Sequence, residues 1–292
     1  MVKALKKIWK RISAPFKWLG RAILNPFKKI TAFFREEPDD APVTDSLQLA
    51  FEEPASFLEH IGALRKHLLR SVIVLIICAV VAFYYLPQLL DFISGPIDGL
   101  ENLTAVDVTE PISVGMRVVL LGAFAVALPY FILEIFLFVG PALSRRARLI
   151  GLLSIPLVAA FFLGGMAFAY YFILPTGLPV LLNFLALEIQ IRPSSYVRFT
   201  TGLMFWFGVV FEFPLLAYLL SAMRVLKPEA LIKNWRIAVV LIAVLAAVIT
   251  PTIDPINMLL VMVPLLFLYA LSILLSVLAG GRRKTKTASD SE

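Results

Sequence analysis

Two glutamates lie inside long apolar stretches of the chain, where an ionisable side chain is costly and usually has a function. Glu212, in the stretch FGVVFEFP, precedes Arg224 by about 12 residues, which is roughly 18 Å of helix. We expect a carboxyl at this depth to be uncharged or hydrogen-bonded, because an isolated charge there is too costly. It has a functional role or forms a structural hydrogen bond between helices. Glu134 lies nearer the end of its stretch, so we expect it to reach water.

The other polar residues suggest no catalytic chemistry. Arg117 is near the end of its apolar stretch, where its long side chain can extend to the lipid surface and anchor the helix. His60 and His67 have too few neighbouring ligands for a metal site, so we expect them at the surface or the membrane interface. The chain has no recognisable nucleophile, phosphate-loop or zinc motif. The sequence therefore predicts no enzyme, no metal, no cofactor and no nucleic-acid partner.

The elements that must position these residues are membrane-spanning helices. Hydrophobic residues make up 60% of the chain and charged residues only 16%, and the apolar residues form blocks long enough to cross a bilayer. We predict an all-α integral membrane protein with six transmembrane helices, at 68–86, 112–138, 150–174, 199–223, 237–249 and 257–279. The fifth has about 13 residues, or roughly 20 Å, so it must thin the bilayer or be sheltered by its neighbours.

The distribution of Lys and Arg predicts the orientation of these helices. Basic residues gather before the first span, in the SRRAR loop, after the fourth span and in the RRKTK tail. By contrast, residues 91–110 contain five acids and no Lys or Arg. Cytoplasmic loops carry the excess of basic residues, so both termini are predicted to be cytoplasmic.

The N-terminal region has a different composition. Residues 1–35 hold ten Lys or Arg and no acid, together with aromatic residues, which suits a segment lying on anionic lipids. A transit peptide is the alternative, but Ser and Thr are few. We predict that 36–55 is an acidic disordered linker, 56–279 is the membrane domain, and 280–292 is a disordered cytoplasmic tail.

Four motifs in this order resemble those of the TatC family, the polytopic subunit of the twin-arginine translocase. They are FLEHIGALRKHLL, FLFVGPALSRRAR, FGVVFEFPLLAYLL and ITPTIDPINMLLVMVPLLFLYALSILL. The resemblance implies a multi-pass plasma-membrane protein that recognises Arg-Arg signal peptides of folded proteins at the cytoplasmic face. It also implies single-span TatA-like and TatB-like partners and transport driven by the proton-motive force. The residues carried over are Leu64, Arg65, Phe138, Pro141 and Leu143 for signal-peptide binding, Glu212 as the polar residue of span four, and Pro251 and Asp254 in an outer turn.

The chain departs from the family pattern at three acidic positions. Ala63, Ala147 and Ala270 stand where the family usually has glutamate, and the first two of these glutamates contact the twin arginines. In one hypothesis Glu59, one helical turn from Ala63, is a substitute acceptor and Glu134 is the second. In the other, the chain is a non-recognising paralogue or scaffold that pairs with another TatC. A secondary transporter is a further alternative, but it would predict an internal repeat, and none is visible.

Overall fold

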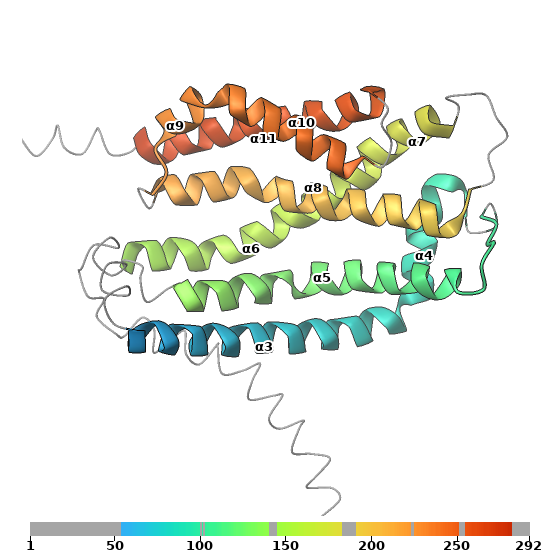
Figure 1. Cartoon of the computed structure of the whole chain (residues 1–292), viewed down its shortest axis with the longest axis horizontal. Helices are drawn as coiled ribbons and strands as arrows, with labels where there is room; N and C mark the ends of the chain where they lie inside the picture. The colour runs from blue at the N-terminus through green and yellow to red at the C-terminus, as the bar shows by residue number, and fades with distance from the viewer. Residues whose placement is uncertain are drawn as a thin grey trace, which may run out of the picture. The chain divides into compact units, whose positions relative to one another are not determined.

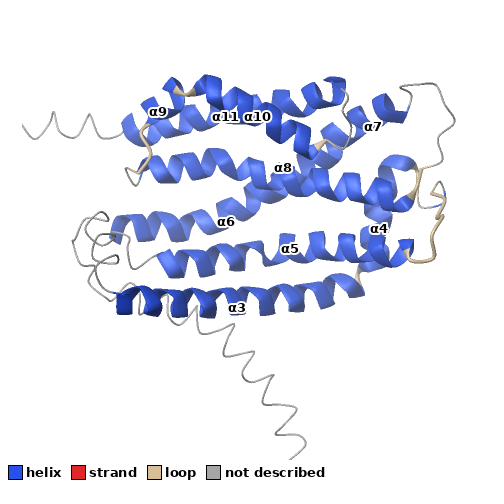
Figure 2. Ribbon diagram, in the orientation of Figure 1, coloured by secondary structure: helices blue, strands red, loops and turns tan. Residues whose placement is uncertain are grey.

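A computed structural model describes residues 54–99, 101, 103–139, 145–182, 191–222, 225–250 and 255–281. The regular elements in these ranges are helices (Figure 2), and one isolated parallel β-bridge joins Leu103 to Ile191. The predicted segment 1–35, nearly all of the predicted linker and residues 282–292 lie outside the described residues. So do Pro141, Leu143, Pro251 and Asp254.

The helices follow the predicted apolar blocks closely (Figure 1). In chain order they are α3 (Pro54–Tyr84), α4 (Leu86–Ser94), η1 (Gly95–Ile97), α5 (Glu110–Val139), α6 (Arg145–Phe168), the π-helical turn η4 (Ala169–Ile173), α7 (Leu174–Leu182), α8 (Pro193–Ala222), α9 (Pro228–Lys233), α10 (Trp235–Ile249) and α11 (Pro255–Gly281).

Five of the described helical segments are long and apolar enough to cross a membrane. The fifth predicted span is α10, which has only 15 residues and falls short of that length. The six-span count and the cytoplasmic termini therefore stay predictions. The N-terminal motif and the first predicted span form one continuous helix, Pro54–Tyr84. The loop predicted at 91–110 begins within α4 and contains η1.

The chain divides into two compact units. The first comprises Met1–Ile77 and Ala127–Leu152, and the second comprises Cys78–Val126 and Leu153–Glu292. In the first unit, Leu133 and Phe136 of α5 are buried. A side chain at Gly151 of α6 would collide with the ring of Phe136, so glycine allows the two helices to approach closely there.

The second unit has an apolar core where α4 and η1 meet α5, α7 and α8. Its buried members are Ile93, Ile97, Val114, Val118, Leu178, Tyr196 and Val197. The hydroxyl of Tyr196 donates to the backbone oxygen of Ile93 at 2.7 Å, and that of Tyr170 donates to Phe92 O at 2.5 Å. These bonds fix α4 because they satisfy carbonyl groups near its C-terminal end.

The C-terminal helices of the second unit also pack together, and α10 and α11 lie side by side next to α8 (Figure 1). A hydrogen bond between the hydroxyls of Ser221 and Ser276 joins α8 to α11. The hydroxyl of Tyr269 on α11 donates to Leu231 O of α9 at 2.6 Å. Hydrogen bonds of this kind hold apolar helices together where no water competes for the polar groups.

Candidate functional site

Glu134 is the centre of a buried polar cluster in the first unit. Its side chain is 1% exposed, so the expectation that it reaches water was wrong. The hydroxyl of Tyr130 donates to Glu134 Oε1 at 2.6 Å. His67 Nδ1 lies 2.5 Å from Glu134 Oε2, and an Arg70 guanidinium nitrogen lies 3.8 Å from the same oxygen. We call these four residues the Glu134 cluster.

Helical spacing explains how the cluster forms. His67 and Arg70 are three residues apart on α3, and Tyr130 and Glu134 are four apart on α5, so each pair shares one helix face. The ring of His67 also meets that of Phe138 edge-on, with centroids 6.0 Å apart. His67 was expected at the surface or the interface, but its side chain is only 19% exposed. The contact with Glu134 keeps His67 in this position, because a buried carboxylate requires hydrogen-bond donors.

The predicted binding residues of α3 are more exposed than His67. Leu64 is 48% exposed and Arg65 is exposed, whereas Phe138 on α5 is half-buried. Glu59 lies in α3 and Ala147 in α6, and the structure does not describe their side chains. Within the first unit, the structure therefore brings His67 between Glu134 and Phe138 while leaving Leu64 and Arg65 accessible.

Glu212 and Arg117 belong to the second unit. Glu212 is half-buried on α8, and its Oε1 atom is buried with no hydrogen-bond partner among the described residues. A buried polar atom without a partner in an apolar segment is costly. Arg117 is exposed, and its anchoring role stays a prediction.

Glu110 is a buried glutamate that sequence reasoning did not single out. It begins α5, and its carboxylate accepts backbone N–H bonds from Val106 at 3.0 Å and Ser194 at 2.9 Å. The Nε atom of Arg192 lies 3.8 Å away. Glu110 thus links the segment before α5 to the beginning of α8. The sequence feature that could have indicated this position is Glu110 followed by Pro111. Pro favours the first turn of a helix, so the pair indicates that a helix begins at Glu110.

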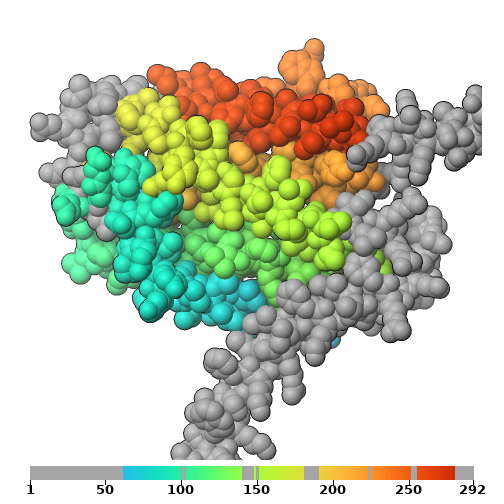
Figure 3. All heavy atoms as spheres, turned by 180° about the vertical axis from the view of Figure 1, so that it is seen from behind, coloured from blue at the N-terminus to red at the C-terminus, as the bar shows by residue number. Residues whose placement is uncertain are grey.

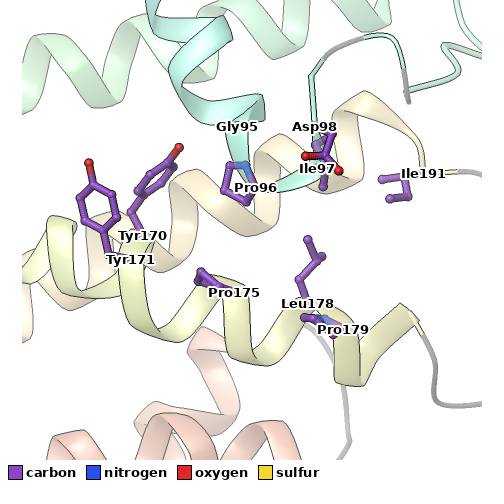
Figure 4. Close-up of a pocket in the computed structure, with 10 residues that line it drawn as sticks. All are labelled: Gly95, Pro96, Ile97, Asp98, Tyr170, Tyr171, Pro175, Leu178, Pro179 and Ile191. Atoms are coloured by element: carbon purple, nitrogen blue, oxygen red, sulfur yellow. The ribbon is translucent and has the colours of Figure 1, made fainter.

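A hollow of about 620 Å³ opens between η1 and the η4–α7 segment (Figure 4). Pro96 and Ile97 line one side and Tyr170, Pro175 and Leu178 line the other. In the space-filling view the cyan α4–η1 segment adjoins the yellow α7 segment (Figure 3). No predicted site residue lines this hollow. Among the described residues, no three His, Cys, Asp or Glu side chains gather as metal ligands.

Comparison with known proteins identifies the family. Residues 59–264 match the model of the Sec-independent protein translocase protein (TatC), which is well over half of the chain. The chain belongs to the TatC family. The match includes Glu59, Leu64, Glu134 and Glu212, and also the alanines at 63 and 147. The basic N-terminal segment lies outside it.

Relatives and solved structures agree with this assignment. The TatC proteins of Carboxydothermus hydrogenoformans and Deinococcus radiodurans are 31% and 34% identical to the chain. The alignments cover 77% and 76% of this chain and 94% and 86% of those proteins. Two crystal structures titled Twin Arginine Translocase Receptor-TatC, one of them in the detergent DDM, are each 29% identical, with TM-scores of 0.67 and 0.68. They cover 75% and 74% of this chain and 99% of their own chains. The chain is thus a helical, multi-pass membrane subunit of a protein translocase, and the transporter alternative receives no support.

Proposed function

We propose that the chain receives twin-arginine signal peptides in the plasma membrane and organises the complex that exports their folded cargo. The observation that carries the proposal is the match over residues 59–264 to the translocase family, whose solved members are titled receptors. In this role the chain acts by binding and assembly rather than by catalysis.

The proposed receiving surface comprises Glu59, Leu64 and Arg65 of α3 together with the end of α5. Leu64 and Arg65 are exposed on α3, and Phe138 contacts His67 across the Glu134 cluster. Pro141 and Leu143 would extend this surface along the following loop. Glu59, one helical turn before Ala63, supplies the carboxylate that the family places at 63, since a guanidinium pair requires anionic acceptors. Glu134 is the second acceptor.

The remaining parts of the chain have supporting roles in this proposal. Glu212, with its buried unpaired oxygen, faces a polar group of a single-span TatA-like or TatB-like partner. Pro251 and Asp254 form an outer turn between α10 and α11, and both termini are cytoplasmic. The basic segment 1–35 lies on anionic lipids, 36–55 is a linker, and transport draws on the proton-motive force. A second TatC copy is a further partner.

Substitution of Glu59 tests the proposed receiving surface. With this chain as the sole TatC in a cell, we expect Glu59→Ala to reduce export of a twin-arginine reporter protein at least about tenfold, the effect of losing one charge-assisted contact of ~1.4 kcal/mol. Lys66→Ala, an exposed change on the same helix, should leave export near the wild-type level. The export assay measures reporter activity outside the cytoplasm.

The opposite result favours the non-recognising paralogue. If the wild-type chain exports the reporter and Glu59→Ala is equally active, Glu59 is not the substitute acceptor. If the wild-type chain exports nothing alone but copurifies with a second TatC, the scaffold hypothesis replaces the receptor. The absence of glutamate at 63, 147 and 270 is the feature that makes this comparison necessary.

A further inference from the structure

The Glu134 cluster contains a guanidinium of the chain's own. Arg70 and Glu134 come from different helices and meet at 3.8 Å, with side chains 22% and 1% exposed. A charge-assisted N–H···O bond is typically about 2.7–2.9 Å, so at 3.8 Å Arg70 forms an ion pair with Glu134 without a close hydrogen bond. His67, by contrast, lies within hydrogen-bond distance of the same oxygen. The buried carboxylate of Glu134 is thus already paired in charge with a guanidinium, but the two groups are too far apart for a hydrogen bond.

Charge balance limits what can join this cluster. The Glu134 carboxylate and the Arg70 guanidinium compensate each other, and His67 adds a second positive charge only when it is protonated. The helix α5, which carries Glu134, is apolar. A second guanidinium added beside Arg70 would place an uncompensated positive charge in a membrane segment, which is strongly unfavourable. We therefore expect a cation from another molecule to bind Glu134 by replacing Arg70, the more loosely placed of its two basic neighbours. Because Arg70 is 22% exposed, it has a route to leave.

We infer that Glu134 is a guanidinium-binding site whose resident occupant is Arg70, and that an arginine of an incoming peptide exchanges with it. Arg70 is then a specificity-determining residue. A bidentate guanidinium can form the parallel bonds that Arg70 lacks at 3.8 Å, whereas a lysine ammonium cannot. The entry of a peptide arginine rests on the proposed signal-binding function. The binding of a guanidinium by Glu134 does not.

Chemical rescue tests the site without any signal peptide. In the purified full chain, Arg70→Ala leaves Glu134 without its guanidinium, and we expect methylguanidinium to raise the unfolding temperature of this variant relative to wild type. Methylammonium should raise it less. Arg70→Ala with Glu134→Gln should show no rescue, and neither should Lys66→Ala, which removes an exposed charge from the same helix. Comparison with wild type corrects for any general denaturing effect of methylguanidinium.

Two results would overturn the inference. One is an Arg70→Ala variant that responds equally to methylguanidinium and methylammonium. The other is a rescue that persists when Glu134 is also replaced. If Arg70→Ala does not fold in detergent, Arg70→Gln removes the guanidinium while keeping a polar side chain, and the same comparison applies.

A labelled Arg-Arg signal peptide then separates the inference from the proposed function. We expect Arg70→Ala to bind it about tenfold more tightly than wild type, or ~1.4 kcal/mol, with no such gain for a matched Lys-Lys peptide. Lys66→Ala should change binding of both peptides equally. Rescue without any peptide binding would refute the proposed function and leave the inference standing. Peptide binding that Arg70→Ala does not strengthen would refute the exchange.

Discussion

Glu110 and Glu134 are both buried carboxylates that hold together segments far apart in the sequence. Glu134 joins α5 to α3 in the first unit, whereas Glu110 joins the segment before α5 to the start of α8 in the second. Each accepts more than one hydrogen bond, so the loss of either leaves several donors unsatisfied. Each also has an arginine nitrogen at 3.8 Å, from Arg192 for Glu110 and from Arg70 for Glu134, and the exchange that we propose concerns Glu134.

Removal of the Glu110 carboxylate should destabilise the second unit. We expect Glu110→Ala to lower the unfolding temperature by several degrees, because the N–H groups of Val106 and Ser194 lose their acceptor. Glu110→Gln keeps one acceptor oxygen and should cost less. Asp107→Ala is the control, since its bond to the Thr109 N–H is exposed. Thermal unfolding in detergent measures all three, and equal values for Glu110→Ala and Asp107→Ala would contradict the role of Glu110.

Sequence reasoning located Glu134 in an apolar stretch but could not find its partners. Tyr130 lies one turn away and could have been predicted as a donor, whereas His67 and Arg70 are on a different helix and are brought near only by tertiary packing. Glu110 was overlooked because it ends a run of five acids that is typical of a solvated loop. The local pattern gives no sign that this particular acid is buried.

At the scale of elements, the sequence predicted where the helices lie better than where they begin and end. Apolar length is a local property, so each predicted span has a helix. The helices α4 and α7 were missed because one lies in a predicted loop and the other directly continues a predicted span through η4. Where two helices touch depends on small residues such as Gly165, whose contact partner Phe207 is far away in the sequence, so local patterns do not reveal the contact.

Gly165 tests one such helix contact in the second unit. A side chain at Gly165 on α6 would lie 2.5 Å from the backbone oxygen of Phe207 on α8, and backbone atoms cannot easily move away. We expect Gly165→Ala to lower the free energy of unfolding by about 1–3 kcal/mol. Gly164→Ala, where nothing lies within 4 Å, is the matched control and should have little effect. Equal denaturation curves for the two variants would show that α6 and α8 do not require this approach.

At the scale of the whole molecule, the predicted orientation places the segment before α5 outside the cell and the C-terminal tail inside. Cys78 is the only cysteine, so Cys78→Ser gives a thiol-free background. On it, we expect Val108→Cys, at a position that is 94% exposed, to react with a membrane-impermeant maleimide in intact cells. Ala288→Cys should react only after lysis. The reverse labelling pattern would overturn the cytoplasmic placement of the termini and the receiving surface with it.

The short helix α10 has a consequence for how the protein is made. With 15 residues it is too short to be a stable membrane helix by itself, yet α10 and α11 lie side by side, and the Tyr269 hydroxyl of α11 bonds the preceding helix α9. If α10 is the fifth membrane span, most of α11 must be synthesised before α10 can be stable in the lipid. During synthesis the two would enter together as a hairpin, and about the last fifth of the chain would remain unassembled until translation is nearly finished.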